Sequence, residues 1–378
     1  MRLRRIFALA LCAALAAAAL SGCKKGGEIG YEDPPPPAEV EGSGFDYTSA
    51  MAYYAPDEIM LRYGDFDVTW EELYFFLAAD VAGADSAYGP IEEWDAEYAA
   101  GSGQSYREMI LEDVLNTLKI YISVEYGAEQ TGVELSDDDL ASIASQREAL
   151  VAQYGGEEGF AAYLAGNNAT EKVFNWSASL NIMYSAIFEK IFGGEYAPNV
   201  PDEAVEAFLA ENEYFKAQHI LIKIVDDANA PLPEAEIAAA RIKAENILAD
   251  LRAYSGDDFP AYFTSVMLAS SQDPAGVQTY PGGYIFPVGT MMPEFEAGTR
   301  ALEAYGLSGI VETSYGYHII YRLPLGFDEA DMDGVSMRQR VAYAEMDVKF
   351  AAWEAELDAR REDAAFASLR LEDVFKRV

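Results

Sequence analysis

The chain has 378 residues, 51% of them hydrophobic, including 25 tyrosines and 19 phenylalanines. This is enough apolar material for two or three packed domains, which excludes a chain that is disordered throughout. Its 26 Lys and Arg are outnumbered by 64 Asp and Glu, and the formal charge of −38 argues against nucleic acid or an anionic membrane surface as a partner. The acidic surplus serves solubility or attracts basic unfolded polypeptides, and composition alone leaves both explanations open.

Residues 1–22 are predicted to be a signal peptide and not part of the fold. The sequence "MRLRRIFALALCAALAAAALSGC" begins with a basic segment, continues with an Ala/Leu-rich run and ends on small residues before Cys23. This ending resembles a bacterial lipobox, by which Cys23 becomes the lipid-bearing first residue of the mature chain and Cys12 leaves with the signal peptide. An ordinary secretory signal and a transmembrane anchor are the alternatives. No later segment is apolar enough to span a bilayer.

Residues 23–44 are predicted to be a lipid-anchored flexible tether. After Cys23 the sequence continues "KKGGEIGYEDPPPPAEVEGSG", with almost no large apolar side chain, so this segment cannot bury a core. Its four consecutive prolines, Pro34 to Pro37, favour an extended and locally stiff chain. We therefore expect the segment to hold the folded domains at a distance from the membrane.

Residues 45–212 are predicted to form a mainly helical region. The stretch "EIMLRYGDFDVTWEELYFFLA" predicts a short hairpin and then a helix after Thr69, with Glu72 at the spacing of a capping box. The stretch "SYREMILEDVLNTLKIYISVEYG" repeats this signal with Ser105 and Glu108. Further helices are expected to begin near Ser136, Asn168 and Pro201. The region shows no metal-ligand spacing or nucleophile motif, and its aromatic side chains are expected in the core.

Residues 213–325 carry alternating strand and helix signals. "FKAQHILIKI" predicts a strand, "PEAEIAAARIKAENILADLRAYSG" a long amphipathic helix closed by Gly256, and "DDFPAYFTSVML" a second helix. After the loop "ASSQDPAGVQTYPGG" come a strand "YIF", a helix around "PEFEAGTRALEAYG", and the strands "SGIVETS" and "GYHIIYRL" in a tight hairpin. This order predicts a small α+β domain. Both histidines of the chain, His219 and His318, fall in its strands, where a buried imidazole needs a polar partner.

Several of these stretches resemble parvulin-type peptidyl-prolyl cis–trans isomerases. "KAQHILIK", "SSQD", "GGYIFPVGTMMPEFEAG" and "LSGIVETSYGYHII" occur in the order and spacing of that family and cover most of residues 213–325. With the lipobox and the helical region, the whole chain resembles a PrsA-like foldase lipoprotein, and "MLRYGDFDVTWEEL" resembles the start of the SurA-type chaperone domain. The resemblance implies a four-stranded antiparallel sheet with helices, inserted in a mainly helical chaperone domain. It also implies that a C-terminal helix in residues 326–378 packs on the N-terminal region.

The resemblance implies a polar network at the catalytic site. His219 and His318 are expected to face each other on adjacent central strands, in a hydrogen-bonded network with Thr313. Strand alternation agrees, because it places His219 on the face of Ala217. Asp273 matches the position beside the carbonyl group that twists. The alternatives are that the histidines only satisfy each other as buried polar groups, and that Asp273 is a turn residue.

The resemblance also implies a pocket for the proline ring. By position, Met291 and Phe295 match the residues of this pocket, with Phe286 as a weaker candidate, and ordinary core packing is the alternative for each. Such a pocket needs no covalent step and no cofactor or metal, because the catalyst only has to favour the twisted amide over the planar one.

Two departures from the family pattern stand out. The turn before the aromatic strand is shortened to Gly282-Gly283-Tyr284, which leaves one pocket wall in doubt, and Tyr315 stands where some parvulins have a small hydroxyl residue. The loop "VDDANAPLPEAE" is acidic, whereas phosphate-directed parvulins have a basic cluster there. We therefore expect no preference for phosphoserine-proline substrates.

The sequence thus predicts a lipid-anchored prolyl isomerase and foldase on the extracytoplasmic face of the bacterial cell membrane. Its expected partners are unfolded or partly folded secreted polypeptides with Xaa-Pro bonds, and the membrane itself through the lipid on Cys23, but no nucleic acid. The alternative is a non-catalytic holdase in which a degenerate parvulin module only binds peptides. Retention of the histidine pair favours the enzyme, and the shortened turn favours the holdase.

Overall fold

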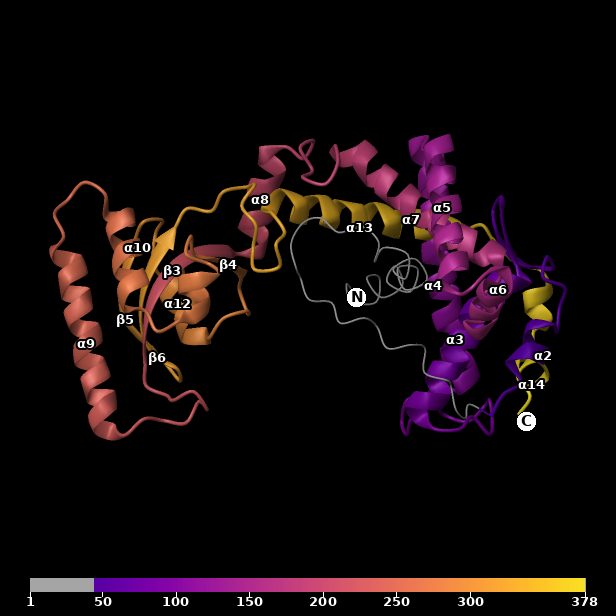
Figure 1. The fold of residues 1–378 in the computed structure, drawn as a ribbon, viewed down its shortest axis with the longest axis horizontal. Coiled ribbons are helices and arrows are strands. Elements are labelled where there is room, and N and C mark those ends of the chain that lie inside the picture. Colours follow the sequence, from indigo (N-terminus) through magenta and orange to yellow (C-terminus); the bar gives the residue numbers. More distant parts are fainter. Residues whose placement is uncertain (1–43, 378) are drawn as a thin grey trace. The chain divides into compact units, whose positions relative to one another are not determined.

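The structure is a computed structural model that describes residues 44–377, and these residues divide into two compact units (Figure 1). Unit 1 comprises the described parts of Met1–Ile191 and Met346–Val378, and unit 2 comprises Phe192–Glu345. In sequence, unit 2 is therefore inserted between two parts of unit 1. The predicted signal peptide, the lipid site at Cys23 and nearly all of the tether lie outside the described residues. Within residues 44–377, no helix is both long enough and apolar enough to cross a membrane.

Unit 1 is mainly helical, as predicted, with one small sheet of strand order β2-β1-β7. Its elements are α2 Tyr47–Met51, β1 Ile59–Tyr63, β2 Phe66–Thr69, α3 Trp70–Tyr88, α4 Tyr106–Thr131, α5 Asp137–Gln153, α6 Glu157–Gly166, α7 Glu171–Phe192, the part of α13 Met337–Asp358 from residue 346 on, β7 Arg361–Asp363, the 3₁₀ helix η2 Ala365–Ser368 and α14 Leu371–Val374. Capping boxes begin three of the helices, with these residue pairs: Thr69 and Glu72, Ser105 and Glu108, Ser136 and Asp139. The first two boxes and the hairpin before α3 were predicted from the sequence, and α6 was not.

The C-terminal segment packs within unit 1. Lys119 of α4 forms an ion pair of 2.8 Å with Asp358 of α13. Tyr126 of α4 donates a hydrogen bond to Glu356 of α13. Strand β7 pairs antiparallel with β1. The chain after residue 345 thus completes a core that the first half of the sequence begins.

Unit 2 is a small α+β fold, as predicted. Its elements are α8 Asp202–Asn212, β3 Tyr214–Lys223, α9 Glu234–Ala253, α10 Phe259–Ser270, α11 Pro274–Gln278, β4 Tyr284–Pro287, α12 Pro293–Arg300, β5 Leu307–Thr313 and β6 Gly316–Leu323. The four strands form an antiparallel sheet of order β4-β3-β6-β5, in which β5 and β6 make the predicted hairpin. Strands β3 and β6 are therefore central and adjacent.

The two faces of this sheet bury different apolar clusters. On one face, Ile220 and Ile319 pack with helices α9 and α10. On the other face, Ala217 and Ile320 pack with Phe295 of α12. Figure 1 shows α9 and α12 on opposite sides of the sheet. Because side chains alternate along a strand, every second residue of β3 and β6 faces α12, and this face carries both histidines.

Two local predictions for unit 2 are wrong. Helix α9 ends at Ala253 with the extended residue Tyr254 as its C-cap, so Gly256 does not close it. The loop expected over residues 269–283 contains the short helix α11, because Asp273 accepts hydrogen bonds from the first N–H groups and Pro274 is compatible with a first helical turn.

Candidate active site

Two histidines face each other across the central strands of unit 2. His219 lies on β3 and His318 on β6, in a register that pairs His219 with Ile320 and Leu221 with His318. Their Nδ1 atoms are 3.0 Å apart, and their rings are nearly parallel, with an interplanar angle of 19°. The two residues are only 8% and 6% exposed, so their ring nitrogens must find partners inside the protein.

Hydrogen bonds continue from the histidine pair on both sides. His219 Nε2 lies 2.7 Å from Asp273 Oδ2, which also accepts a hydrogen bond of 2.6 Å from the Tyr284 hydroxyl. On the other side, His318 Nε2 lies 2.8 Å from Thr313 Oγ1. The five side chains come from four strands and the N-cap of α11, and they form one continuous network.

The network fixes the direction of its own hydrogen bonds when both imidazoles are neutral. The Asp273 carboxylate can only accept, so His219 donates from Nε2 and accepts at Nδ1. His318 must then donate from Nδ1 and accept at Nε2, which makes the Thr313 hydroxyl its donor. Thr313 Oγ1 in turn accepts from the Tyr315 backbone N–H at 3.2 Å. Each ring nitrogen has a partner, so the tautomers of both rings are set by their neighbours.

Three groups of the site have pKa values that agree with these protonation states. Burial, and then the neighbouring His219, lower the pKa of His318 to about 3, so this ring is neutral near pH 7. Burial on its own raises the pKa of Asp273, but hydrogen bonds from His219 and Tyr284 outweigh it and hold the pKa at about 2. Burial and then the bond to Asp273 raise the pKa of Tyr284 above its usual value, so its hydroxyl stays protonated and donates.

An apolar surface lies against this network. The Phe295 ring approaches both imidazoles, with ring centroids 5.1 Å from His219 and 5.5 Å from His318, and in both cases the contact is edge-to-face. Met291 is partly exposed and packs against the cluster that contains Phe295. Phe286 lies deeper, fully buried, with its ring centroid 5.9 Å from that of Phe295. The surface therefore offers Met291 to a ligand directly, while Phe286 supports Phe295 from within.

The structure brings the predicted polar residues together and adds two that the sequence reasoning missed. Tyr284 was treated only as part of the shortened turn, although alternation along "YIF" places it on the same face as Phe286. Glu296 is buried and accepts the backbone N–H groups of Gly289, Thr290 and Met291, so it fixes the loop that carries Met291. The sequence signal that could have identified Glu296 is its position directly after Phe295, a predicted pocket residue.

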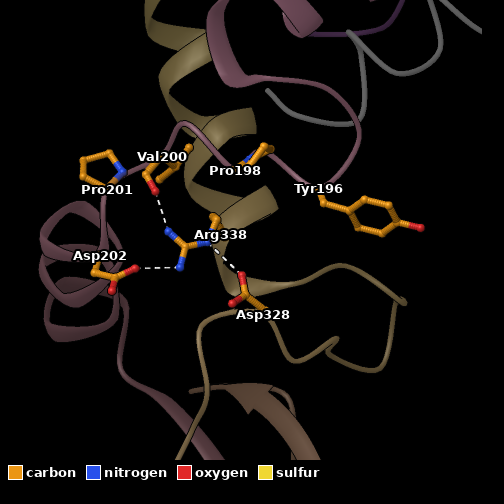
Figure 2. A pocket seen from close by; sticks show the side chains of 7 residues that line it. All are labelled: Tyr196, Pro198, Val200, Pro201, Asp202, Asp328 and Arg338. Carbon is orange, nitrogen blue, oxygen red and sulfur yellow. Dashed lines mark hydrogen bonds and ion pairs between the residues drawn. The ribbon is translucent and has the colours of Figure 1, made fainter.

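Other parts of the described chain offer weaker candidates for a site. Within residues 44–377, no group of three metal-ligating side chains comes together. A hollow of about 450 Å³ lies elsewhere in unit 2, lined by Tyr196, Pro198, Val200, Pro201, Asp202, Asp328 and Arg338 (Figure 2). Arg338 is occupied there, because it binds Asp202, Asp328 and the Val200 carbonyl oxygen. Its positive charge is already offset by two carboxylates, so Arg338 is not available as a cation for a ligand in this hollow.

Comparison with known proteins links the site to a family. Residues 205–322 match the family model of the PPIC-type PPIase domain. The foldase protein PrsA of Oceanobacillus iheyensis is 26% identical over 241 residues, which cover 62% of this chain and 69% of that protein.

Two solved structures overlap with the chain at low TM-scores. The foldase protein PrsA of Lactococcus lactis is 14% identical, with 83% of this chain and 98% of that chain covered and a TM-score of 0.32. A SurA-like chaperone of Campylobacter jejuni is 21% identical, with 63% and 88% covered and a TM-score of 0.24.

The match to the domain model spans all five residues of the polar network and the apolar surface beside it. Residues 205–322 are therefore a PPIC-type PPIase domain, and the chain is similar to the PrsA-type foldases.

Proposed function

We propose that the chain is a peptidyl-prolyl cis–trans isomerase and foldase for secreted polypeptides. The observation that carries this proposal is the His219–His318 pair, bonded at 3.0 Å, beneath the apolar surface of Phe295 within a PPIC-type PPIase domain. The substrate is an Xaa-Pro bond whose proline ring rests on Met291 and Phe295. No cofactor or metal enters the reaction.

The reaction requires only that the site favour a twisted amide. Rotation about the Xaa-Pro bond must cross roughly 18 to 20 kcal/mol, because resonance gives the C–N bond partial double-bond character. An apolar surface that holds the proline ring and removes water from the carbonyl group weakens the charge-separated resonance form. A carboxylate beside the carbonyl oxygen acts in the same direction, and Asp273 is ionised at neutral pH because its pKa is about 2.

We assign His219, His318 and Thr313 a positioning role in this mechanism. Asp273 Oδ2 already accepts hydrogen bonds from His219, Tyr284 and the Gly276 backbone N–H, so it is held in place and is not a free nucleophile. With a pKa of about 3, His318 is neutral near pH 7, and its single N–H is already donated to His219. The network therefore sets the shape of the pocket floor and the position of the Asp273 charge without moving protons.

The rest of the chain suggests how clients are collected and held near the membrane. We propose that residues 45–212 and 326–378 form one chaperone domain that binds unfolded chains, with the isomerase domain, residues 213–325, inserted in it. We further propose that the lipid on Cys23 anchors the protein outside the cytoplasmic membrane, as the sequence "LSGC" suggests. Metabolic labelling with a fatty acid should mark the wild-type chain and not the Cys23→Ser variant, and equal labelling of both would refute the anchor.

A direct assay separates the enzyme from the holdase. The mature chain without its lipid, residues 24–378, should accelerate cis-to-trans isomerisation of short Xaa-Pro peptides. His318→Ala, which opens the floor, and Met291→Ala, which removes the exposed part of the pocket, should both lower kcat/KM. If the wild-type chain does not accelerate isomerisation but still suppresses aggregation of an unfolded client, the protein is a holdase and the two histidines have a structural role only.

A further inference from the structure

The turn before β4 carries few side chains. Between Tyr280 and Tyr284 the chain turns through Pro281, Gly282 and Gly283, so two of the three turn residues carry no side chain. A Cβ added at Gly282 would meet no atom within 4 Å, which means that the space beside this turn is open. Gly282 and Gly283 therefore add no side chain to the surface formed by Met291 and Phe295.

A segment outside the matched domain packs on the same surface. The loop between β6 and α13 begins after residue 323, beyond the end of the family match at residue 322. Its residue Met332 is partly buried and packs against the cluster that contains Phe295 and Tyr284. The Tyr280 hydroxyl, immediately before the glycine turn, donates a hydrogen bond of 3.4 Å to the Met332 carbonyl oxygen. This bond joins the backbone at Met332 to the segment that leads into the glycine turn.

The loop is held firmly enough to present this side chain. Asp331 is buried and accepts hydrogen bonds from the backbone N–H groups of Asp333 and Val335, and Arg340 binds its second oxygen at 2.7 Å. Gly334, at a φ of 78°, completes the turn that has Met332 near its tip.

A second anchor joins the base of the loop to the sheet. Glu329 forms an ion pair of 2.5 Å with Lys216 of β3 and accepts the Gly326 N–H. The loop is thus tied at its base to a strand of the isomerase sheet and at its tip to Tyr280. A loop tied at both ends can offer an apolar side chain at low entropic cost.

We propose that Met332 is a specificity-determining residue that forms the missing wall of the proline pocket. This inference rests on the proposed function and deepens it. A methionine suits the role because its unbranched thioether side chain adapts to apolar groups of different shape. The wall contacts the proline ring or the apolar side chain next to it, and so strengthens substrate binding without taking part in chemistry.

The first test is kinetic. Met332→Ala should raise KM for a Leu-Pro peptide and lower kcat/KM roughly three- to tenfold, because part of one apolar contact is lost. Met332→Leu should restore most of the activity, and Glu329→Gln, which weakens the anchor to Lys216, should have an intermediate effect. Ile242→Ala is the matched control, because Ile242 is an exposed apolar residue of α9, the helix on the opposite face of the sheet.

The second test does not depend on activity. In the chain labelled with methyl-¹³C methionine, a Leu-Pro peptide should shift the resonances of Met332 and Met291, whereas the same peptide with Ala in place of Pro should not. Suppose that the wild-type chain accelerates isomerisation, that Met332→Ala is as active, and that the Met332 methyl resonance does not shift. The proposed role of Met332 is then refuted, and the isomerase activity is supported. If no peptide is isomerised but the Met332 methyl resonance shifts with the proline peptide and not with the alanine peptide, the isomerase activity is refuted and the role of Met332 in binding proline is supported. If neither acceleration nor a shift occurs, both are refuted.

Discussion

Glu125 of α4 is a carboxyl group whose charge is costly in the folded protein. Burial is the main cause that raises its pKa from 4.5 to about 7. A hydrogen bond of 3.2 Å from Trp176 Nε1 opposes this shift, and the nearby carboxylate of Glu72 adds to it. The folded state therefore binds a proton at Glu125 more tightly than the unfolded state does.

The sign and size of the effect on stability follow from this difference. Below a pH of about 4.5, Glu125 is protonated in both states and does not destabilise the fold. The destabilisation grows as the pH rises and reaches its full size above about pH 7. A pKa raised from 4.5 to about 7 corresponds to about 3 kcal/mol. Because the side chain is only partly buried and its charge is attracted by Lys172, we expect that Glu125→Gln recovers about 2 kcal/mol.

Tryptophan fluorescence is a suitable readout for this prediction. The four tryptophans, Trp70, Trp94, Trp176 and Trp353, all lie in unit 1, so their emission reports the unfolding of that unit. In urea, Glu125→Gln should raise the free energy of unfolding at about pH 8, and by only about a quarter as much at about pH 5. Glu148→Gln, at an exposed position of α5, should change nothing at either pH. A stabilisation of equal size at both pH values, or a destabilised variant at pH 8, would show that the Glu125 charge does not destabilise the folded state.

The remaining predictions concern both units. A Cβ at Gly127 would lie 2.5 Å from the Trp353 ring, so Gly127→Ala should destabilise unit 1 by about 1 to 3 kcal/mol in the same urea assay, and an unchanged midpoint would contradict the packing of α13. The NMR shifts of the His318 ring should stay constant from about pH 8 to pH 5, because its pKa is about 3; a titration near pH 6.5 would show that the ring is not desolvated as described. Asp273→Asn should lower the midpoint of chemical unfolding of unit 2, followed by circular dichroism, near pH 7 and much less near pH 2, because the contribution of the ionised carboxylate is lost as the pH falls from 3.8 towards 2. Peptides with phosphoserine before proline should react no faster than those with Glu, since residues 225–236 are acidic, and a clear preference for phosphoserine would overturn this prediction.

The sequence was most informative where a local pattern determines the structure. Capping residues such as Thr69 and Ser105 marked helix starts because their side chains bond backbone groups three residues away. The alternation of β3 placed His219 on one face of the sheet, and the family resemblance supplied His318 and Thr313 as its partners. The same logic failed at Gly256, because the helix ended earlier on a residue with extended backbone and needed no glycine.

Contacts made by loops could not be predicted from the sequence. Asp273 reaches His219 because the preceding residue, Gln272, donates its backbone N–H to the Leu221 carbonyl oxygen of β3. Tyr284 joins them because β4 is the neighbour of β3. Met332 lies far from the pocket in sequence, and no periodicity indicates that its loop returns to Tyr280. Such contacts depend on how loops close over the sheet, which propensity and spacing do not encode.

The proposed isomerase activity can be measured directly as cis–trans exchange of an Xaa-Pro peptide at equilibrium by NMR, with the wild-type chain and with Met291→Ala. Without a catalyst this exchange takes about 10 to 100 s, so catalysis shows as exchange broadening of the separate cis and trans signals. We predict clear broadening with the wild-type chain and its loss in Met291→Ala. Sharp signals with the wild-type chain, at a peptide concentration that shifts the Met291 methyl, would contradict isomerase activity, because the pocket would then bind the peptide without catalysing its isomerisation.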